Sequence, residues 1–215
     1  DLTLQDYAAA GSIADTKRGG AGERSEADAE IARLLDTGDI AAMLALTVKS
    51  RKNILVSGGT STGKTTFLNA LIREIPLHER LIVIEDTPEL HLGHQNAVGL
   101  LAARSALGEA QVTADSLLAA SLRMRPDRII VGELRGPEAY TFLRAVNTGH
   151  PGSMTSVHAD SAERAVEQIA LLVLQTGTRL NREDVSHYVR NTVHVCVQLG
   201  RVGGRRHLEQ IVFAR

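Results

Sequence analysis

One short stretch, residues 53–66, restricts the fold of this chain more than any other part of the sequence. A buried apolar strand, Ile54–Val56, precedes a glycine-rich loop, and an amphipathic helix follows the loop. From Gly58 to Thr65 the loop matches the pattern GxxxxGK[ST] in the strand–loop–helix setting that this pattern requires. Glycines let successive backbone N–H groups face an anion, and the helix N-terminus adds its dipole. The sequence therefore predicts a nucleoside triphosphate site.

The residues expected to contact the nucleotide lie in this loop and the first helical turn. Lys64 is predicted to reach the β and γ phosphates, and the Thr65 hydroxyl is predicted to ligate Mg²⁺. The alternative is an ordinary glycine-rich turn, which the agreement of motif and setting disfavours. The full set predicted to bind ATP is Gly59, Thr60, Ser61, Thr62, Gly63, Lys64, Thr65 and Thr66.

Three other predicted strands end in polar side chains that suit phosphate chemistry, namely Glu85, Glu133 and His158. Open α/β sheets bind ligands at the carboxyl ends of their strands, so we expect these side chains to line one edge. Glu133 ends an apolar run, as does the acid that commonly holds Mg²⁺ beside a phosphate loop. Gly132 stands where many ATPases have aspartate, which shifts the acidic role to Glu133. The alternatives are a turn cap for Glu85, a structural carboxylate for Glu133 and a core or turn residue for His158.

The sequence leaves open the roles of three arginines and one further histidine. Arg123, Arg125 and Arg128 crowd a predicted helix end, where they either complement the helix dipole or supply one phosphate-directed side chain. His150 lies in a tight loop and is equally well explained as structural. The arginine-rich turn near residue 205 is interpreted as a solvated hairpin tip.

Composition and periodicity predict one α/β domain with a mainly parallel central sheet, helices on both faces and a C-terminal β-hairpin. Hydrophobic residues make up 43% of the 215 residues and aromatic residues 3%, so the core is expected to be aliphatic. Two helices, near 25–38 and 40–48, are expected to cover one edge of the sheet. The formal net charge of −1 argues against strong nucleic-acid binding. No apolar run has the length of a membrane span.

Four stretches carry a resemblance to a known family: Ser57–Thr66, Ile84–Leu90, Leu122–Gly136 and Thr148–Ala159. They resemble, in order, the phosphate loop, acidic box, second acidic strand and histidine box of secretion ATPases. The best match is the type IV secretion system traffic ATPase, and the resemblance covers Asn53–Gln198 closely.

The resemblance implies a RecA-like P-loop domain that forms a homohexameric ring and binds ATP and Mg²⁺ between subunits. The ring would lie at the cytoplasmic face of the inner membrane with other type IV secretion components, where peripheral membrane association is compatible with it. ATP turnover would power channel or pilus assembly, or substrate transport. The family has a preceding domain, so we expect a fragment: residues 1–24 a linker remnant and residues 25–215 the ATPase domain. The lone Cys196 excludes the tetracysteine zinc element of type II secretion relatives.

The resemblance also suggests roles for individual side chains. Glu85 would polarise the attacking water, His158 would sense the γ-phosphate, and Arg125 would reach the nucleotide of a neighbouring subunit. Thr65 and Glu133 would hold Mg²⁺, Glu133 through water. Three alternatives stay open at this point: a nonhydrolysing nucleotide-gated scaffold, a small-molecule phosphotransferase and a nucleic-acid motor.

Overall fold

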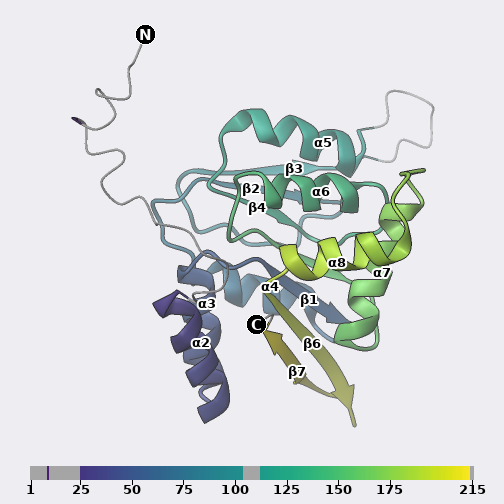
Figure 1. Cartoon of the computed structure of the whole chain (residues 1–215). Coiled ribbons are helices and arrows are strands. Elements are labelled where there is room, and N and C mark those ends of the chain that lie inside the picture. The colour runs from purple at the N-terminus through teal and green to yellow at the C-terminus, as the bar shows by residue number, and fades with distance from the viewer. Residues whose placement is uncertain (1–8, 10–24, 104–111, 214–215) are drawn as a thin grey trace.

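The computed structural model describes residue 9, residues 25–103 and residues 112–213. The predicted linker remnant, apart from residue 9, lies outside these residues. The described part contains a seven-stranded sheet in the order β3-β2-β4-β5-β1-β6-β7, and every neighbouring pair is parallel except β6 and β7 (Figure 1). The strands are β1 Ile54–Gly58, β2 Leu81–Glu85, β3 Ala97–Leu101, β4 Arg128–Val131, β5 Met154–Val157, β6 Val195–Val202 and β7 Arg205–Phe213.

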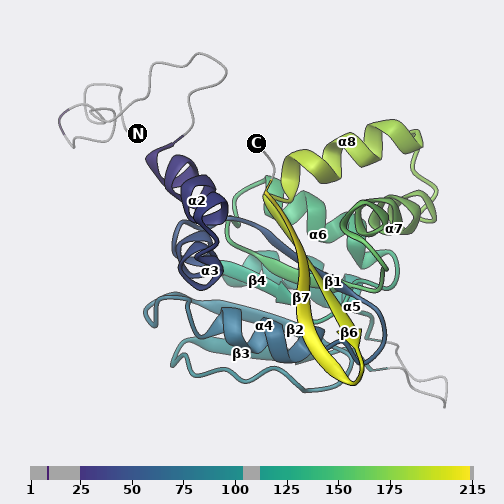
Figure 2. The same cartoon turned by 90° about the horizontal axis from the view of Figure 1, so that it is seen from below.

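Helices cover both faces of this sheet because the central strands are apolar on both sides (Figures 1 and 2). In β1, for example, Leu55 belongs to one hydrophobic cluster while Ile54 and Val56 belong to the other. The first face carries α5 Ala114–Ser121, the 3₁₀ turn η1 Leu122–Met124, α6 Glu138–Asn147, α7 Ala162–Leu174 and α8 Arg182–Thr192. The opposite face carries α2 Glu26–Thr37, α3 Ile40–Lys49 and α4 Lys64–Ile72. The predicted RecA-like α/β architecture is confirmed.

The first two helices begin where the sequence predicts but pack elsewhere. The Ser25 side chain accepts a hydrogen bond from the Asp28 backbone N–H and donates one to the Asp28 carboxylate, so the predicted pair caps α2 through the Ser25 hydroxyl. Ile31 and Met43 lie in the same buried cluster as Leu68 of α4. These helices therefore extend the layer on the α4 face, and the expectation that they cover an edge was wrong.

A β-bulge in β7 changes which face of the sheet the side chains near the tip of the β6–β7 hairpin point to. Gln198 pairs with Gln210, but the next residue, Leu199, pairs with Leu208, so Glu209 is an extra residue in β7. Side chains alternate along a strand, and one inserted residue reverses that alternation. Leu208 consequently packs on the same face as Ile211, in the cluster that contains α4.

Cys196 lies near the start of β6, between β1 and β7, and faces the α7–α8 side. Its side chain is buried, and this burial raises the pKa of the thiol to about 12.

Within the part of the chain that the structure describes, no helix is long and apolar enough to cross a membrane.

Candidate functional site

A cavity of about 570 Å³ opens at the carboxyl ends of the parallel strands. Open α/β sheets place their ligands at this edge, beside the point where the strand order reverses. Here β1 delivers the phosphate loop, β2 and β4 deliver Glu85 and Glu133, and β5 delivers His158. The lining residues are Gly59 to Thr66, Glu85, Asp86, Thr87, Glu89, Gly132, Glu133, Arg135, Ser156, His158 and Arg206.

The phosphate loop keeps its shape through two glycines that cannot carry a side chain. Gly63 is the N-cap residue just before α4 and has a φ of +93°, in the left-handed region that favours glycine. A Cβ at Gly58 would collide with the Thr62 side chain and lie 3.0 Å from the carbonyl oxygen of Leu199. The loop is thus wrapped tightly between β1, β6 and the start of α4, with the N-terminus of α4 facing the cavity.

Lys64 is held across the loop by carbonyl oxygens and by one carboxylate. Its Nζ donates to the carbonyl oxygen of Gly58 at 2.9 Å and to that of Gly59 at 3.4 Å. The same nitrogen lies 3.2 Å from Oε1 of Glu133. The ammonium group is therefore fixed inside the cavity, between the loop and the end of β4.

Glu133 is surrounded by positive charge. Burial disfavours its ionised form, but the hydrogen bond from Arg135 and the charge of Lys64 outweigh this effect, so the pKa of the Glu133 carboxyl lies below its ordinary value. Arg135 also reaches Oδ2 of Asp86 at 3.4 Å. Glu133 is consequently an ionised acceptor at neutral pH, linked to the loop after β2 through Arg135.

Glu85 organises the segment that follows β2. Its Oε1 accepts hydrogen bonds from the backbone N–H groups of Glu89 and Leu90, both at 3.0 Å. Glu85 therefore supports a turn, as the alternative interpretation held, and it also lines the cavity. A Cβ at residue 132 would lie 3.3 Å from Cγ of Glu85, so glycine there gives this carboxylate its room.

The two histidines lie at opposite ends of β5. His158 follows the strand and lines the cavity with an exposed ring. His150 precedes the strand, and its Nδ1 lies 3.0 Å from the carbonyl oxygen of Ala145. His150 is absent from the cavity wall, so the structure brings only His158 to the phosphate loop.

The three clustered arginines do not enter this cavity. Arg123 and Arg125 are exposed, and Arg125 has a φ of +51° where the 3₁₀ turn ends, just before the amino end of β4. Of the residues predicted for the site, Arg125 is thus the one that lies at the opposite end of the strands. It cannot serve the cavity of its own chain.

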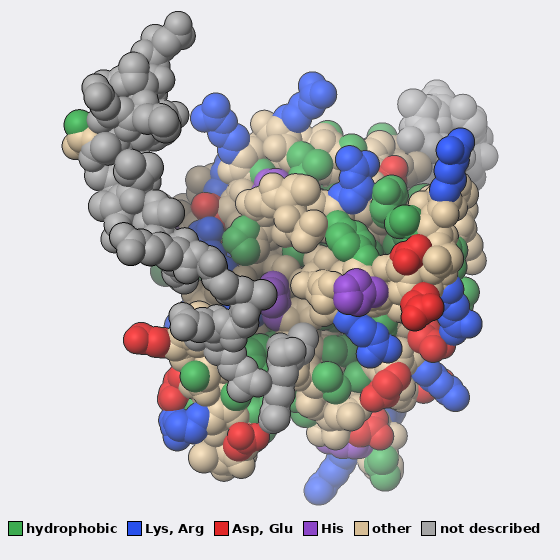
Figure 3. Space-filling view, in the orientation of Figure 1, with side chains coloured by type: hydrophobic (Ala, Val, Ile, Leu, Met, Phe, Trp, Pro, Cys, Tyr) green, Lys and Arg blue, Asp and Glu red, His purple; other side chains and the backbone are tan. Residues whose placement is uncertain are grey.

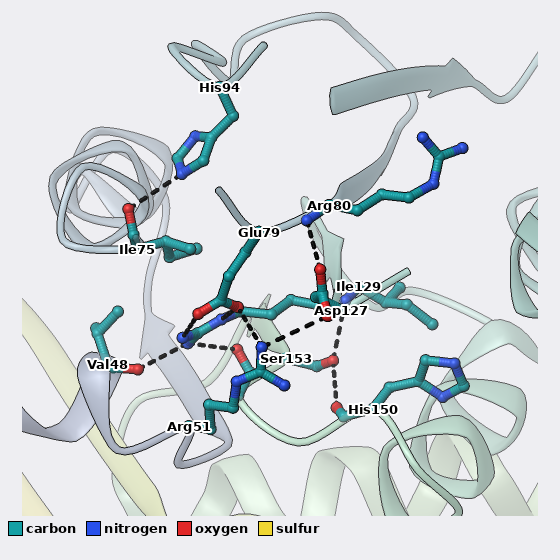
Figure 4. Close-up of polar contacts among 12 residues, drawn as sticks. Val48, Arg51, Ile75, Glu79, Arg80, His94, Asp127, Ile129, His150 and Ser153 are labelled. Carbon is teal, nitrogen blue, oxygen red and sulfur yellow. Dashed lines mark hydrogen bonds and ion pairs between the residues drawn. The ribbon is translucent and has the colours of Figure 1, made fainter. Parts of the chain in front are cut away.

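Arg128 fits neither of the interpretations offered for the cluster. Its side chain is fully buried and makes a two-pronged contact with Glu79, at 2.7 and 2.9 Å. It also donates to the carbonyl oxygen of Val48 at 2.7 Å. Figure 4 shows Glu79 and Arg51 meeting beside Asp127, and the Arg51 guanidinium lies 3.1 Å from the Glu79 carboxylate. Arg128 therefore ties β4 to the segments before β1 and β2.

The residues predicted to hold Mg²⁺ are suited to it. Thr65 and Glu133 both line the cavity and offer oxygen ligands, which Mg²⁺ prefers together with phosphate oxygens of a bound nucleotide. Across the described residues no cluster of three or more His, Cys, Asp or Glu side chains could hold a metal by itself.

Sequence reasoning missed several cavity residues. Arg135 lies two positions after Glu133, and its charge next to a strand end was the available signal. Ser156 lies within β5, where its Oγ donates to the carbonyl oxygen of Gly132 at 2.7 Å. Arg206 was interpreted as part of a solvated tip, and although it is exposed, it lines the cavity. The exposure of Arg206 agrees with that interpretation, and only its place in the cavity wall was not predicted.

A family model described as "Type II/IV secretion system protein" matches residues 27–201. The chain belongs to this family. The VirB11 type IV secretion system protein of Bartonella quintana is 43% identical over 177 residues, 81% of this chain and 50% of that protein. The protein of the same name from Brucella suis is 40% identical over 217 residues, 97% of this chain and 60% of that protein. The chain thus spans about half to three-fifths of the length of these relatives.

Solved structures of the family confirm the fold. The VirB11 ATPase from the Brucella suis type IV secretion system, crystallised with sulphate, superposes with a TM-score of 0.89 at 39% identity. That match covers 99% of this chain and 65% of the other. The pilus retraction motor PilT with bound ADP gives a TM-score of 0.61 at 27% identity, covering 76% and 48%.

Proposed function

We propose that residues 25–215 form the ATP-hydrolysing domain of a type IV secretion motor. The observation that carries this proposal is the meeting of Lys64 and Glu133, 3.2 Å apart, inside a phosphate-loop cavity also lined by Glu85 and His158. A cationic loop and carboxylates around one cavity are the parts that phosphoryl transfer to water requires. Relatives named VirB11 at 40% identity or more point to the type IV system.

In this proposal the chain contributes positioning and charge. Backbone N–H groups of the loop and Lys64 hold the phosphates, while Thr65 and Glu133 hold Mg²⁺, which neutralises developing charge when bound. Glu85 is assigned to polarising the attacking water, and its backbone contacts keep it in place. His158, exposed at the cavity rim, is assigned to sensing the γ-phosphate.

The proposed assembly is a homohexameric ring at the cytoplasmic face of the inner membrane, in contact with other secretion components. Arg125 supports a ring indirectly, because it is exposed at the strand ends remote from its own cavity and is available to a neighbouring subunit. Strong nucleic-acid binding is not part of the proposal. The net charge is −1, and basic and acidic side chains both occur on the face in Figure 3.

The experiment that tests this function compares Lys64→Ala with Lys49→Ala, which removes an exposed lysine of α3. ATP affinity is measured by calorimetry, and ATPase rate is measured against protein concentration with oligomer mass alongside. We expect the parent and Lys49→Ala to bind and hydrolyse ATP, with a rate per chain that rises as rings form. Lys64→Ala should lose measurable ATP affinity, because the charge-assisted phosphate contact is gone. Unchanged affinity in Lys64→Ala would refute the proposal.

A nonhydrolysing scaffold is the second candidate, and it predicts carboxylates directed away from the phosphates. Glu133 instead contacts Lys64, and Glu85 lines the same cavity. ATP binding without turnover by a ring of confirmed mass would favour the scaffold over the motor.

A further inference from the structure

The segment that follows β2, residues 86–94, lies against α4, the helix that starts at the phosphate loop. Two of its side chains, Leu90 and Leu92, are half-buried and pack on the apolar cluster to which α4 contributes. At the end of the segment the ring of His94 is buried, and its Nε2 lies 3.1 Å from the carbonyl oxygen of Ile75, just beyond α4 (Figure 4). Apolar packing and one buried polar contact thus hold the segment beside the helix.

Asn69, a residue of α4, binds the backbone of this segment with both ends of its side-chain amide. Its Oδ1 accepts a hydrogen bond from the His91 N–H at 2.7 Å, and its Nδ2 donates one to the carbonyl oxygen of Glu89 at 3.1 Å. Asparagine is a weaker helix former than alanine or leucine, so helix propensity does not explain its place in α4. The two contacts with the segment do.

Glu85 binds the same peptide unit as Asn69. The peptide between Glu89 and Leu90 offers its carbonyl oxygen to Asn69 and its N–H to Oε1 of Glu85, the latter at 3.0 Å. In a trans peptide these two groups point in opposite directions, so the peptide lies between the two side chains. The place of the Glu85 carboxylate therefore depends on a peptide that Asn69 holds from the other side.

This contact joins β2 to the phosphate loop by a shorter route than the sheet does. Within the sheet, β4 and β5 lie between β2 and β1, the strand that precedes the loop. Asn69 stands only five positions after Lys64, the first residue of α4 (69 − 64). Five residues of α-helix span about 7.5 Å, so a short helical element connects Asn69 to the loop.

We propose that Asn69 is a positioning residue for Glu85, and that it fixes this carboxylate relative to the phosphate loop. The inference rests on the proposed function, in which Glu85 polarises the attacking water. Water and phosphate must meet in a defined geometry, and a misplacement of about 1 Å can cost about a hundredfold in rate. Asn69 does not line the cavity, so its effect on the reaction passes through Glu85.

The test begins with Asn69→Leu, which removes both hydrogen bonds, keeps a side chain of similar size and favours the helix. We expect kcat to fall about tenfold or more while ATP affinity and KM stay at parental values, since the loop still holds the phosphates. Asn191→Leu, at an exposed asparagine of α8 whose amide contacts the His187 ring, is the matched control and should change neither. Rates are measured with oligomer mass and urea unfolding alongside.

A double-mutant cycle with Glu85→Gln separates positioning from a general structural role. If Asn69 acts through the Glu85 carboxylate, Asn69→Leu should cost less than about twofold in the Glu85→Gln chain, because the charge that it positions is already gone. Single-turnover assays measure these slow variants. Losses of about tenfold in both backgrounds would show that the two residues act independently, and would overturn the inference.

Other outcomes also decide against the inference. An unchanged kcat in Asn69→Leu, or a loss of ATP affinity as large as the loss of kcat, would overturn it and leave the proposed function standing. A parental rate in Glu85→Gln would remove the carboxylate role on which it depends. Asn69→Ala, judged by the same criteria, replaces Asn69→Leu if leucine prevents folding. A parent chain that does not hydrolyse ATP in rings of confirmed mass would overturn the proposed function itself, and this inference with it.

Discussion

Nζ of Lys64 and Oε1 of Glu133 lie 3.2 Å apart, although 69 positions separate the two residues (133 − 64). The pair joins the phosphate loop after β1 to the end of β4, across β5, which lies between these strands. A bound nucleotide with Mg²⁺ would meet both side chains at once. The contact therefore marks where the terminal phosphate and its metal are expected.

Glu133→Gln should separate binding from hydrolysis. The amide keeps the shape of the side chain but loses the charge, so ATP affinity should persist while the rate falls about a hundredfold or more. The variant should also require more Mg²⁺, because the side chain that would hold the metal through water loses its charge. Steady-state ATPase assays over a magnesium series measure both effects. Glu74→Gln, at an exposed carboxylate, is the control, and a parental rate in Glu133→Gln would make Glu133 structural.

Glu85→Gln should slow hydrolysis by a comparable factor without changing the magnesium requirement. Its amide oxygen can still accept from the N–H groups of Glu89 and Leu90, so the turn should remain intact. Any loss of rate would then reflect the missing charge beside the attacking water. Comparing the magnesium series of the two glutamine variants distinguishes the roles, and identical series would contradict the assignment.

Breaking the buried Glu79–Arg128 pair should destabilise the fold strongly. Side-chain exposure is 3% for Glu79 and 0% for Arg128, so Glu79→Gln leaves a buried guanidinium without its counter-charge. We expect a loss of about 3–5 kcal/mol in the free energy of unfolding, measured by urea denaturation. Glu167→Gln is the control: it breaks a 2.7 Å pair with Arg182 whose side chains are 52% and 58% exposed. That change should cost less than about 1 kcal/mol, and equal losses would contradict the argument.

His194 should make stability depend on pH near neutrality. Burial, aided by the charge of Lys52, lowers the pKa of His194, and its Nδ1 accepts a hydrogen bond from the Asn53 N–H at 2.9 Å. The unfolded chain therefore binds more protons between the folded and unfolded pKa values, so stability is lost as pH falls through about 6.5. Urea denaturation between about pH 7.5 and about pH 5.5 measures this loss. His194→Asn keeps an acceptor that does not titrate and should flatten the profile, whereas His78→Asn, at an exposed site, should not.

Arg125 is tested by mixing defective subunits. Arg125→Ala protein should bind ATP but hydrolyse it poorly if the arginine completes a neighbour's site. Mixed with Glu133→Gln protein, it should recover activity, since some interfaces pair an intact Glu133 with an intact Arg125. Arg123→Ala, which removes the neighbouring exposed arginine, is the control. No recovery despite exchange of subunits, shown by fluorescence transfer, would contradict a role in a neighbouring site.

The sequence predicted those parts of the site that follow from local pattern. Lys64 and Thr65 were identified because strand, glycine loop and helix are consecutive in the chain. Glu85, Glu133 and His158 were identified because each ends an apolar strand, and parallel strands bring their carboxyl ends to one edge. Their placement around one cavity agrees with this reasoning, and their chemical roles remain predictions.

The sequence did not predict features that depend on contacts between distant segments. In the sequence, Arg128 looks like its neighbours in a basic cluster. The fold pairs it with Glu79, which lies 49 positions earlier (128 − 79). Arg206 was interpreted as part of a solvated, arginine-rich hairpin tip, and its place in the cavity wall was not predicted. The extra residue Glu209 changes the alternation of side chains along β7, so the face that Arg206 occupies depends on how β7 pairs with β6.

The buried thiol of Cys196 has a practical consequence for measuring motion in this domain. With a pKa of about 12 and a position between β1 and β7, it can be alkylated only when the sheet opens around β6. The chain has one cysteine, so the mass of the alkylated product directly counts the molecules that have opened. A ligand that binds the closed form alone should slow labelling by the factor 1 + [L]/Kd. The alkylation rate of Cys196 therefore measures local opening around β6, the strand next to β1 and its phosphate loop, without an engineered probe.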